Sequence, residues 1–212
     1  MVDKGTIRLY GCGGCGINQV AFFNNADEEP NCAHIKTSYV DASRSNLRDT
    51  FNEEDVFILQ NVDGSGKVRK ENHREIANVV KQILLQMEPG DMNVVVFSAS
   101  GGSGSVLGPL IMGELLERGH TAVCVVVGSD ESIITATNTL NTLKSLEAIS
   151  KRSELPVVMY YEHNDRERKR GEVDTQMRLA ISTLTVLANR RNREIDTKDI
   201  ANWAQFSKTT SV

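Results

Sequence analysis

The feature that most constrains the fold is a glycine- and serine-rich stretch at residues 98–105. Before it, residues 93–97 form an apolar run rich in β-branched side chains, which is typical of a buried strand. After it, residues 106–117 carry apolar side chains at helical spacing. The sequence therefore predicts a strand, a glycine-rich loop and a helix N-terminus in direct succession.

This order of elements favours binding of an anion. Glycine has no Cβ, so backbone N–H groups in such a loop can approach a ligand closely. A helix start adds unpaired N–H groups and the positive end of the helix dipole. Ser103 and Ser105 add hydroxyl donors. A plain flexible turn is the alternative interpretation.

A second unit of the same kind opens the chain. Residues 6–10 predict a strand, and a helix is expected from Ile17 onward; the glycines between them fit G-x-G-x-x-G. Alone, this match indicates a dinucleotide-binding loop only weakly. Asp41 follows the next predicted strand, at 34–40, where an acid would suit a ribose hydroxyl. Asp41 could equally lie near phosphates and a magnesium ion, or cap a helix beginning near Ser45.

Strands and helices alternate along the rest of the chain. Further strands are expected at 55–60, 120–127 and 155–161, and helices at 71–87, 133–150, 172–191 and around 201–204. The predicted fold is α/β, with a mostly parallel sheet and helices on both faces. The apolar face of helix 133–150 is expected to include Ile133 and Leu140, and that of helix 172–191 to include Leu179. Ligands in such sheets gather at the carboxyl ends of the strands.

Composition excludes several classes of protein. The 212 residues carry a formal net charge of −4, which argues against a general nucleic-acid binder. No apolar run approaches membrane-spanning length. The net charge and the absence of such a run mean that neither nucleic acid nor a membrane is an expected partner. Cys12 and Cys15 form a C-x-x-C pair, but no second Cys/His pair is suitably placed for a structural zinc site. Four cysteines without a secretion signal suggest a reducing cytoplasm.

Three loops resemble the tubulin/FtsZ superfamily. Residues 11–18 are similar to its first nucleotide loop. Residues 100–105 resemble its signature loop, GGGTGTG, with serines in place of the first glycine and both threonines. Residues 194–199 resemble the catalytic loop N-x-D-x-x-D, with Glu194 replacing the asparagine. Further stretches at 104–111, 143–149 and 199–203 are similar to the bacteriophage tubulins of this superfamily, and together the matches cover nearly all of the chain.

The resemblance implies a GTP-binding domain of the tubulin/FtsZ type, which binds GTP or GDP with Mg²⁺ held mainly by phosphates and water. It implies the following nucleotide contacts: Gly11, Cys12, Gly13, Gly14, Cys15, Gly16, Asn18, Asp41, Ser43, Gly64, Ser65, Gly66, Lys67, Ser100, Gly101, Gly102, Ser103, Gly104, Ser105, Asp130, Glu131, Asn164 and Asp174. Within this set, Asp41 and Ser43 would lie near the phosphates, and residues 64–67 would sense the γ-phosphate. Asp130 and Glu131 would reach the ribose, although Ile134 stands where the family usually has an acid.

The same resemblance implies how guanine would be read and how GTP would be hydrolysed. Asn18, Asn164 and Asp174 fall where the family reads guanine, and a carboxylate at Asp174 could accept from the N1–H and the N2 amine, a donor pair that adenine lacks. Asp196 and Asp199 would reach the γ-phosphate of a neighbouring subunit, so that polymerisation completes the active site. From the residues alone, both aspartates could instead cap a helix.

The resemblance also implies an organisation and a cellular role. Residues 1–191, with the long helix 172–191, would form the GTP-binding domain, and 192–212 the catalytic loop and a following helix. A second domain is expected to be lacking, which would leave polymerisation and hydrolysis weak. The partner would be the chain itself, in a head-to-tail filament that positions phage DNA in the cytoplasm of an infected bacterium.

Two other functions stay open. An NAD-dependent Rossmann oxidoreductase would explain residues 11–16 and Asp41, but not the 100–105 loop or the Asp196/Asp199 pair. A GTP-regulated structural filament protein with little turnover is the second. A P-loop NTPase is not favoured, because Val68 replaces the hydroxyl residue that would have to follow Lys67.

Overall fold

The computed structural model describes residues 4–24, 30–60, 66, 69, 73–165, 167–191 and 196–204. Six strands form one sheet in the order β3-β2-β1-β4-β5-β6, and every neighbouring pair is parallel. The strands are β1 (Thr6–Cys12), β2 (His34–Asp41), β3 (Val56–Ile58), β4 (Met92–Ser98), β5 (Ala122–Ser129) and β6 (Met159–Asn164). The strand order reverses between β1 and β4, so the loops after these two strands open into one crevice at their carboxyl ends.

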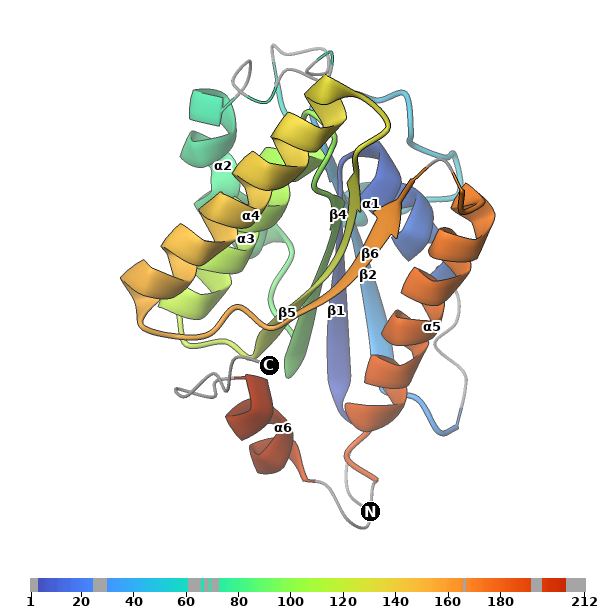
Figure 1. Ribbon diagram of the computed structural model, residues 1–212. Helices are drawn as coiled ribbons and strands as arrows, with labels where there is room; N and C mark the ends of the chain where they lie inside the picture. The colour runs from blue at the N-terminus through green and yellow to red at the C-terminus, as the bar shows by residue number, and fades with distance from the viewer. Residues whose placement is uncertain are drawn as a thin grey trace.

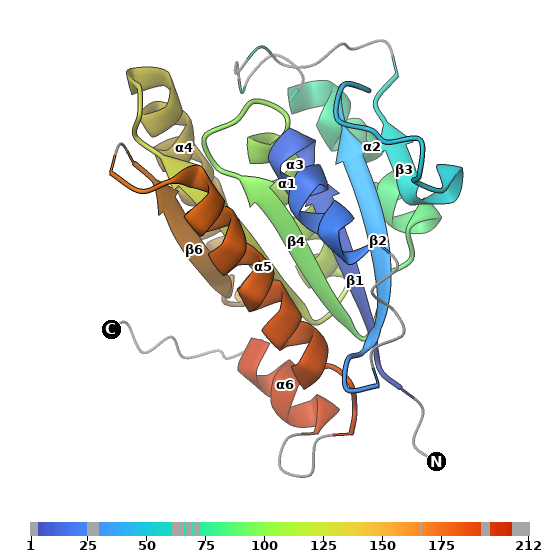
Figure 2. The ribbon, with the colours of Figure 1, turned by 90° about the vertical axis from the view of Figure 1, so that its right-hand side faces the viewer.

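Helices cover both faces of the sheet, as the alternating sequence pattern predicts. Figure 2 shows α1 and α5 on the near face and α2, α3 and α4 behind it. The helical segments are α1 (Gly13–Val20), η1 (Ala21–Phe23), η2 (Glu53–Asp55), α2 (His73–Gln86), α3 (Gly104–Glu117), α4 (Ile133–Ser153), α5 (Arg170–Leu187) and α6 (Thr197–Ala204). The prediction of an α/β fold with a parallel sheet is confirmed.

The core has two halves because strand side chains alternate between the faces of the sheet. Leu9 of β1 lies in one cluster, with Met177 and Ile181 of α5. Tyr10, the next residue, lies in the other cluster, with Leu107 of α3. All five side chains are fully buried, and burial of each aliphatic or aromatic side chain stabilises the fold by about 1.5–3 kcal/mol.

Two glycines let helices lie close to the central strands. A Cβ on Gly16 of α1 would come within 2.1 Å of the Val96 carbonyl oxygen on β4. A Cβ on Gly108 of α3 would come within 2.3 Å of the Phe97 ring. These close approaches bring the N-termini of α1 and α3 down onto the carboxyl ends of β1 and β4.

The structure corrects several local expectations. No helix begins near Ser45, since residues 42–52 form turns and bends. The sixth strand begins at Met159, later than expected. In α4, Ile133 and Leu140 are 87% and 53% exposed. The side of α4 that faces the protein near its start carries polar residues instead, namely Thr135, Asn138, Thr139 and Thr142. Leu179 of α5 is also exposed.

None of the helices in the described part of the chain is long and apolar enough to cross a membrane.

Candidate functional site

The two glycine-rich loops meet backbone to backbone at the carboxyl ends of β1 and β4. A Cβ on Gly104 would lie 2.6 Å from the Cys12 carbonyl oxygen, and one on Gly13 would lie 2.7 Å from the Gly104 nitrogen. Gly13 also has a φ of +68°, a left-handed conformation that favours glycine. Side chains at these positions would push the loops apart, so both glycines are required by the contact itself.

A cavity of about 610 Å³ lies above this contact. Its lining comes from three loops: Cys12, Gly13, Gly14, Cys15, Asp41, Ser43, Ser45, Asn46, Ser98, Gly101, Gly102, Ser103 and Gly104. The structure thus gathers most of the residues expected around the phosphates. We call this the phosphate cavity, and residues 98–105 the phosphate loop.

The electrostatics of the phosphate cavity suit an anion. Cys12 and Ser103 stand at the N-caps of α1 and α3, and neither of these two side chains makes a capping hydrogen bond. Their first-turn N–H groups and the positive ends of both dipoles therefore face the cavity. Burial raises the pKa of the Asp41 carboxyl, whereas hydrogen bonds from the Ala42 N–H and from the Ser103 and Asn46 side chains act to lower it.

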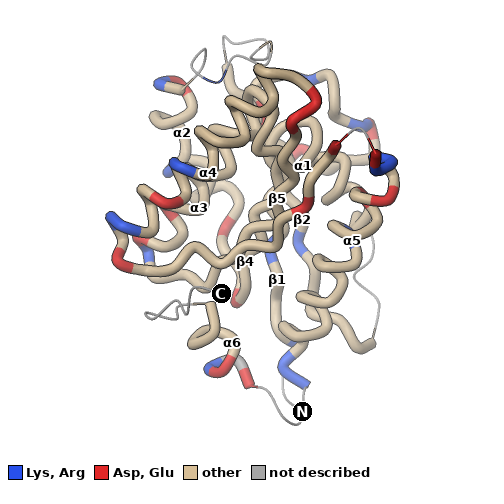
Figure 3. The backbone as a smooth tube through the Cα atoms, viewed as in Figure 1, with Lys and Arg blue, Asp and Glu red and all other residues tan. Residues whose placement is uncertain are grey.

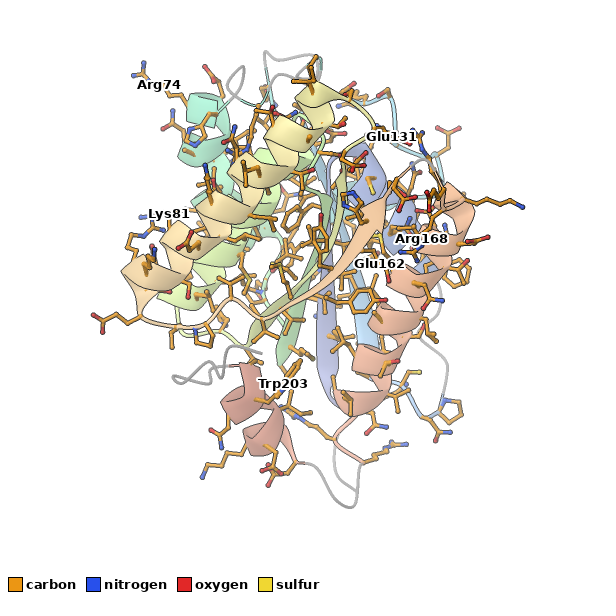
Figure 4. All side chains as sticks on the ribbon, in the orientation of Figure 1. Arg74, Lys81, Glu131, Glu162, Arg168 and Trp203 are labelled. Carbon is orange, nitrogen blue, oxygen red and sulfur yellow. The ribbon has the colours of Figure 1, made fainter. Side chains whose placement is uncertain are left out.

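A second cavity of about 300 Å³ adjoins the first and shares Cys15, Ser98 and Gly101 with it. It is lined by Cys15, Asn18, Gln19, Ser98, Ser100, Gly101, Val127, Ser129, Glu131, Thr135, Asn164, Arg170 and Asp174. Figure 4 shows Glu131 at the upper end of the molecule, where the strands end. We call this the base cavity. Together the two cavities form an elongated site whose ends differ in chemistry.

Hydrogen-bond acceptors characterise the base cavity. The Oδ1 atom of Asn164 is buried and has no hydrogen-bond partner among the described residues. Asp174 accepts a hydrogen bond of 2.6 Å from Nε2 of Gln19, whose Oε1 accepts one of 3.0 Å from Nε of Arg178. Because Arg178 can only donate, its bond fixes which end of the Gln19 amide faces Asp174. The cavity thus presents a carboxylate and an unpaired amide oxygen to a ligand.

Two carboxylates near the base cavity contact basic side chains. Glu131 pairs with Arg170 at 2.7 Å. Asp130 contacts Nε2 of His163 at 3.2 Å and is not among the residues that line the cavity. The structure therefore places Glu131, but not Asp130, on the cavity wall.

Other predicted site residues lie elsewhere. Gly11 packs under Gly16, where a Cβ would be 2.8 Å from the Gly16 carbonyl oxygen, so both are buried beneath the first loop. Ser105 donates its hydroxyl to the Gly102 carbonyl at 2.8 Å and thereby stabilises the phosphate loop internally. Gly66 is exposed. The expectations for Gly64, Ser65, Lys67 and Glu194 lie outside the described residues.

Both cysteines of the C-x-x-C pair line the phosphate cavity. Burial raises the pKa of Cys15 to about 12, with a smaller contribution from the charge of Asp174, and it raises the pKa of Cys12 well above its usual range. Burial therefore favours the protonated form of both thiols, whereas the nucleophilic form of cysteine is the thiolate. In the described part of the chain, no group of three or more potential ligand side chains is arranged to hold a metal ion.

Asp196 and Asp199 lie at the other end of the sheet. Figure 1 shows α6 below the sheet, whereas the glycine-rich loops are above it. Figure 3 shows that residues of both charges occur at this lower end. Asp196 Oδ1 accepts hydrogen bonds from the N–H groups of Lys198 and Asp199, at 2.7 and 2.9 Å. Asp199 Oδ2 accepts one from the Asp196 N–H at 3.1 Å. The capping role is thus present, and the two aspartates do not meet the cavities within one chain.

Sequence reasoning missed Gln19, Asn46 and Arg170, which line the cavities, and it missed Asn138 and Thr142, whose side chains bond to carbonyls of the phosphate loop. The sequence does contain a signal for Asn138 and Thr142, because small polar residues recur at helical spacing along 135–142. That period identifies a polar face, but nothing in the sequence shows that this face points inward.

The comparisons with known proteins agree with this geometry. The model of the Tubulin/FtsZ family, GTPase domain, matches residues 6–163. The chain belongs to the Tubulin/FtsZ family. Phage tubulin-like proteins of Pseudomonas phages phiKZ and 201phi2-1 are each 30% identical to it, over 98% and 95% of this chain.

Solved structures show the same likeness. The protofilament of TubZ from bacteriophage PhiKZ matches 97% of this chain and 64% of its own, with a TM-score of 0.87 and 30% identity. The phage tubulin PhuZ with GDP matches 97% of this chain and 63% of its own, with a TM-score of 0.85 and 29% identity. The chain spans 65% and 62% of the lengths of the two phage relatives.

Proposed function

We propose that this chain binds GTP across the two cavities, with its phosphates in the phosphate cavity and its guanine in the base cavity. The observation that carries this proposal is the continuity of the two cavities. One end offers uncapped helix N-termini and glycine N–H groups, and the other offers Asn164 Oδ1 and the Asp174 carboxylate. Guanine supplies donors at N1 and N2 to such acceptors, whereas adenine has an acceptor at N1. The relative whose structure holds GDP supports the same choice.

The magnesium ion of such a site would be held mainly by phosphate oxygens and water. Asp41 is the one carboxylate among the residues that line the phosphate cavity, and it is 4% exposed. A carboxylate oxygen suits the oxygen-only preference of Mg²⁺. When bound, the ion would neutralise charge on the phosphates. Asp41, with Ser103 and Asn46 as its hydrogen-bond partners, would orient water around it.

We also propose that hydrolysis requires a second copy of the chain. The two aspartates lie at the opposite end of the sheet from the cavities, so head-to-tail stacking would bring Asp196 and Asp199 of one subunit to the phosphates of the next. Their carboxylates would polarise the attacking water, while loop N–H groups stabilise the charge that develops. The relative whose structure is a protofilament supports this arrangement. In this proposal, residues 1–191 form the nucleotide-binding part and 192–212 supply the catalytic aspartates.

The first test is the identity of the bound nucleotide. Heat release and chromatography of the purified chain, followed by calorimetric titration with GTP, ATP and NADH, are expected to show guanine nucleotide and tight binding of GTP alone. Binding of NADH without a preference for guanine would refute the proposal and favour a dinucleotide oxidoreductase.

A GTP-regulated filament with little turnover is the second candidate. It is favoured by the observation that both aspartates already cap α6. Asp199→Asn separates the two functions, because asparagine keeps a capping oxygen and lacks the charge. If the pair is catalytic, GTP binding and sedimentable polymer persist while phosphate release in the assembled form falls by about 10²-fold or more. Unchanged phosphate release per polymerised subunit favours the structural filament.

Two of the relatives are tubulin-like proteins of phages, which supports a role in an infected bacterium. We propose that the filament positions phage DNA in the cytoplasm of the infected bacterium. Fluorescence microscopy of infected cells is expected to show centred DNA with the unmodified chain and displaced DNA with Asp199→Asn. Centred DNA in both would contradict the proposal.

A further inference from the structure

Three consecutive carbonyl groups of the phosphate loop point toward a single helix. The Ala99 carbonyl lies 2.9 Å from Oγ1 of Thr142, whose single hydroxyl proton is shared with the Asn138 carbonyl at 2.7 Å. The carbonyls of Ser100 and Gly101 accept bonds of 3.2 and 3.3 Å from Nδ2 of Asn138. Both donors come from the buried polar face of α4, where Asn138 is 7% exposed and Thr142 is fully buried.

These bonds determine where the loop N–H groups point. In a trans peptide the carbonyl of one residue and the N–H of the next point in opposite directions. Holding the carbonyls of residues 99–101 toward α4 therefore directs the N–H groups of residues 100–102 away from it. The Ser100 N–H donates to Oγ of Ser98 at 3.3 Å. Gly101 and Gly102 line the phosphate cavity, and no acceptor among the described residues pairs with their N–H groups, which are therefore available to an anion.

We propose that Asn138 and Thr142 are positioning residues that orient the phosphate-binding N–H groups before the ligand arrives. The inference rests on the proposed function, because it assigns these residues to the phosphate end of that site. Neither side chain touches the nucleotide in this scheme. A preset array of N–H donors binds an anion without a reorganisation cost when the ligand arrives.

The chemistry of Asn138 matches this task closely. Its amide nitrogen has two hydrogens, and each is used on one of two successive carbonyls. A carboxylate has no donor, and an apolar side chain would leave both carbonyls without partners. The helix that carries Asn138 is itself fixed, because Ser132 and Thr135 form a capping box at its start. Thr139 Oγ1 then links α4 to β5, because it accepts a hydrogen bond of 3.1 Å from the Ser129 N–H.

The test compares ligands with and without phosphates. Asn138→Leu and Thr142→Val in the full chain remove the donors, whereas Asn141→Leu makes the matched change at an exposed position of α4. Calorimetry is expected to show GTP affinity reduced about tenfold or more in the two variants, and guanosine affinity changed by less than about twofold. Thr142→Ser keeps the hydroxyl and is expected to restore GTP affinity.

Each outcome is decisive. Equal weakening of GTP and guanosine, or unchanged GTP affinity in a variant that still binds guanosine, overturns the inference. If Asn138→Leu does not fold, the Thr142→Val and Thr142→Ser pair gives the same comparison. Failure of the unmodified chain to bind GTP refutes the proposed function, and the inference with it, before any variant is made.

Discussion

Gln19 offers the sharpest test of how the base cavity selects its ligand. Its side chain is 2% exposed and bridges α1 to α5, donating to Asp174 and accepting from Arg178. Gln19→Leu has nearly the same volume but removes both bonds. Arg178 then loses this acceptor, and Asp174 lies one helical turn away on α5, at the i, i+4 spacing that favours an ion pair. We expect Asp174 to turn toward Arg178 and away from the cavity.

The magnitude follows from the bonds involved. A hydrogen bond to a charged group contributes about 1.5–3 kcal/mol, which corresponds to about 10- to 150-fold in affinity. If Asp174 accepts from the N2 amine of guanine, the unmodified chain should bind GTP about tenfold or more tightly than ITP, which lacks that amine. In Gln19→Leu the two ligands should bind within about threefold of each other.

Calorimetric titration of GTP and ITP into the full chain measures this ratio. Gln176→Leu is the matched control, because Gln176 is exposed on α5 and lies outside the base cavity. A Gln19→Leu protein that folds and keeps the GTP-to-ITP ratio of the unmodified chain refutes the reasoning. A loss of affinity that is the same for both ligands would also refute it, because that pattern indicates a general structural defect.

Three further predictions concern stability. Because burial raises the pKa of Asp41, the folded chain holds this proton more tightly than the unfolded chain does, and the free energy of unfolding should fall as pH rises through the folded-state pKa. Asp41→Asn should remove that fall, and thermal unfolding at a series of pH values measures it. Asp196→Ala should destabilise α6 by about 1 kcal/mol, seen as faster hydrogen exchange of the Lys198 amide, whereas Asp196→Asn should preserve its protection. Gly108→Ala should lower the free energy of unfolding by about 1–3 kcal/mol, because its Cβ would clash with the Phe97 ring. Gly113→Ala is the control and should not lower it, because the nearest atom to its Cβ would be 3.4 Å away.

The glycines explain why the sequence predicts so much of the site. A glycine loop between a strand and a helix indicates a close backbone approach, and Gly13 and Gly104 prove to be such positions because they contact the opposite loop. The parallel topology then places both loops at one edge of the sheet. Such a glycine pattern can be recognised from a few consecutive residues, although the loop that each glycine contacts lies far away in the sequence.

Contacts between segments that are far apart in the chain are harder to predict from the sequence. Hydrophobic spacing predicts that Ile133 and Leu140 lie on the buried face of α4, and this prediction is wrong because both side chains are exposed. That side is polar near the start of α4, since it lies against loop carbonyls that require donors. The sequence gives no signal for the role of Gln19 either, because its partners Asp174 and Arg178 lie 155 and 159 residues away. Only the fold brings α5 beside α1.

Asp196 and Asp199 could cap α6 and also act on the nucleotide of a neighbouring subunit, because these two roles do not exclude one another. The capping bonds use Oδ1 of Asp196 and Oδ2 of Asp199, so the second oxygen of each carboxylate takes no part in the cap. Both side chains are exposed, and α6 is fixed to the sheet by Ile200 and Ala204. A cap of this kind holds two carboxylates at a defined spacing on a surface that faces away from their own nucleotide cavity. This is the geometry required of a group that acts on a neighbouring subunit.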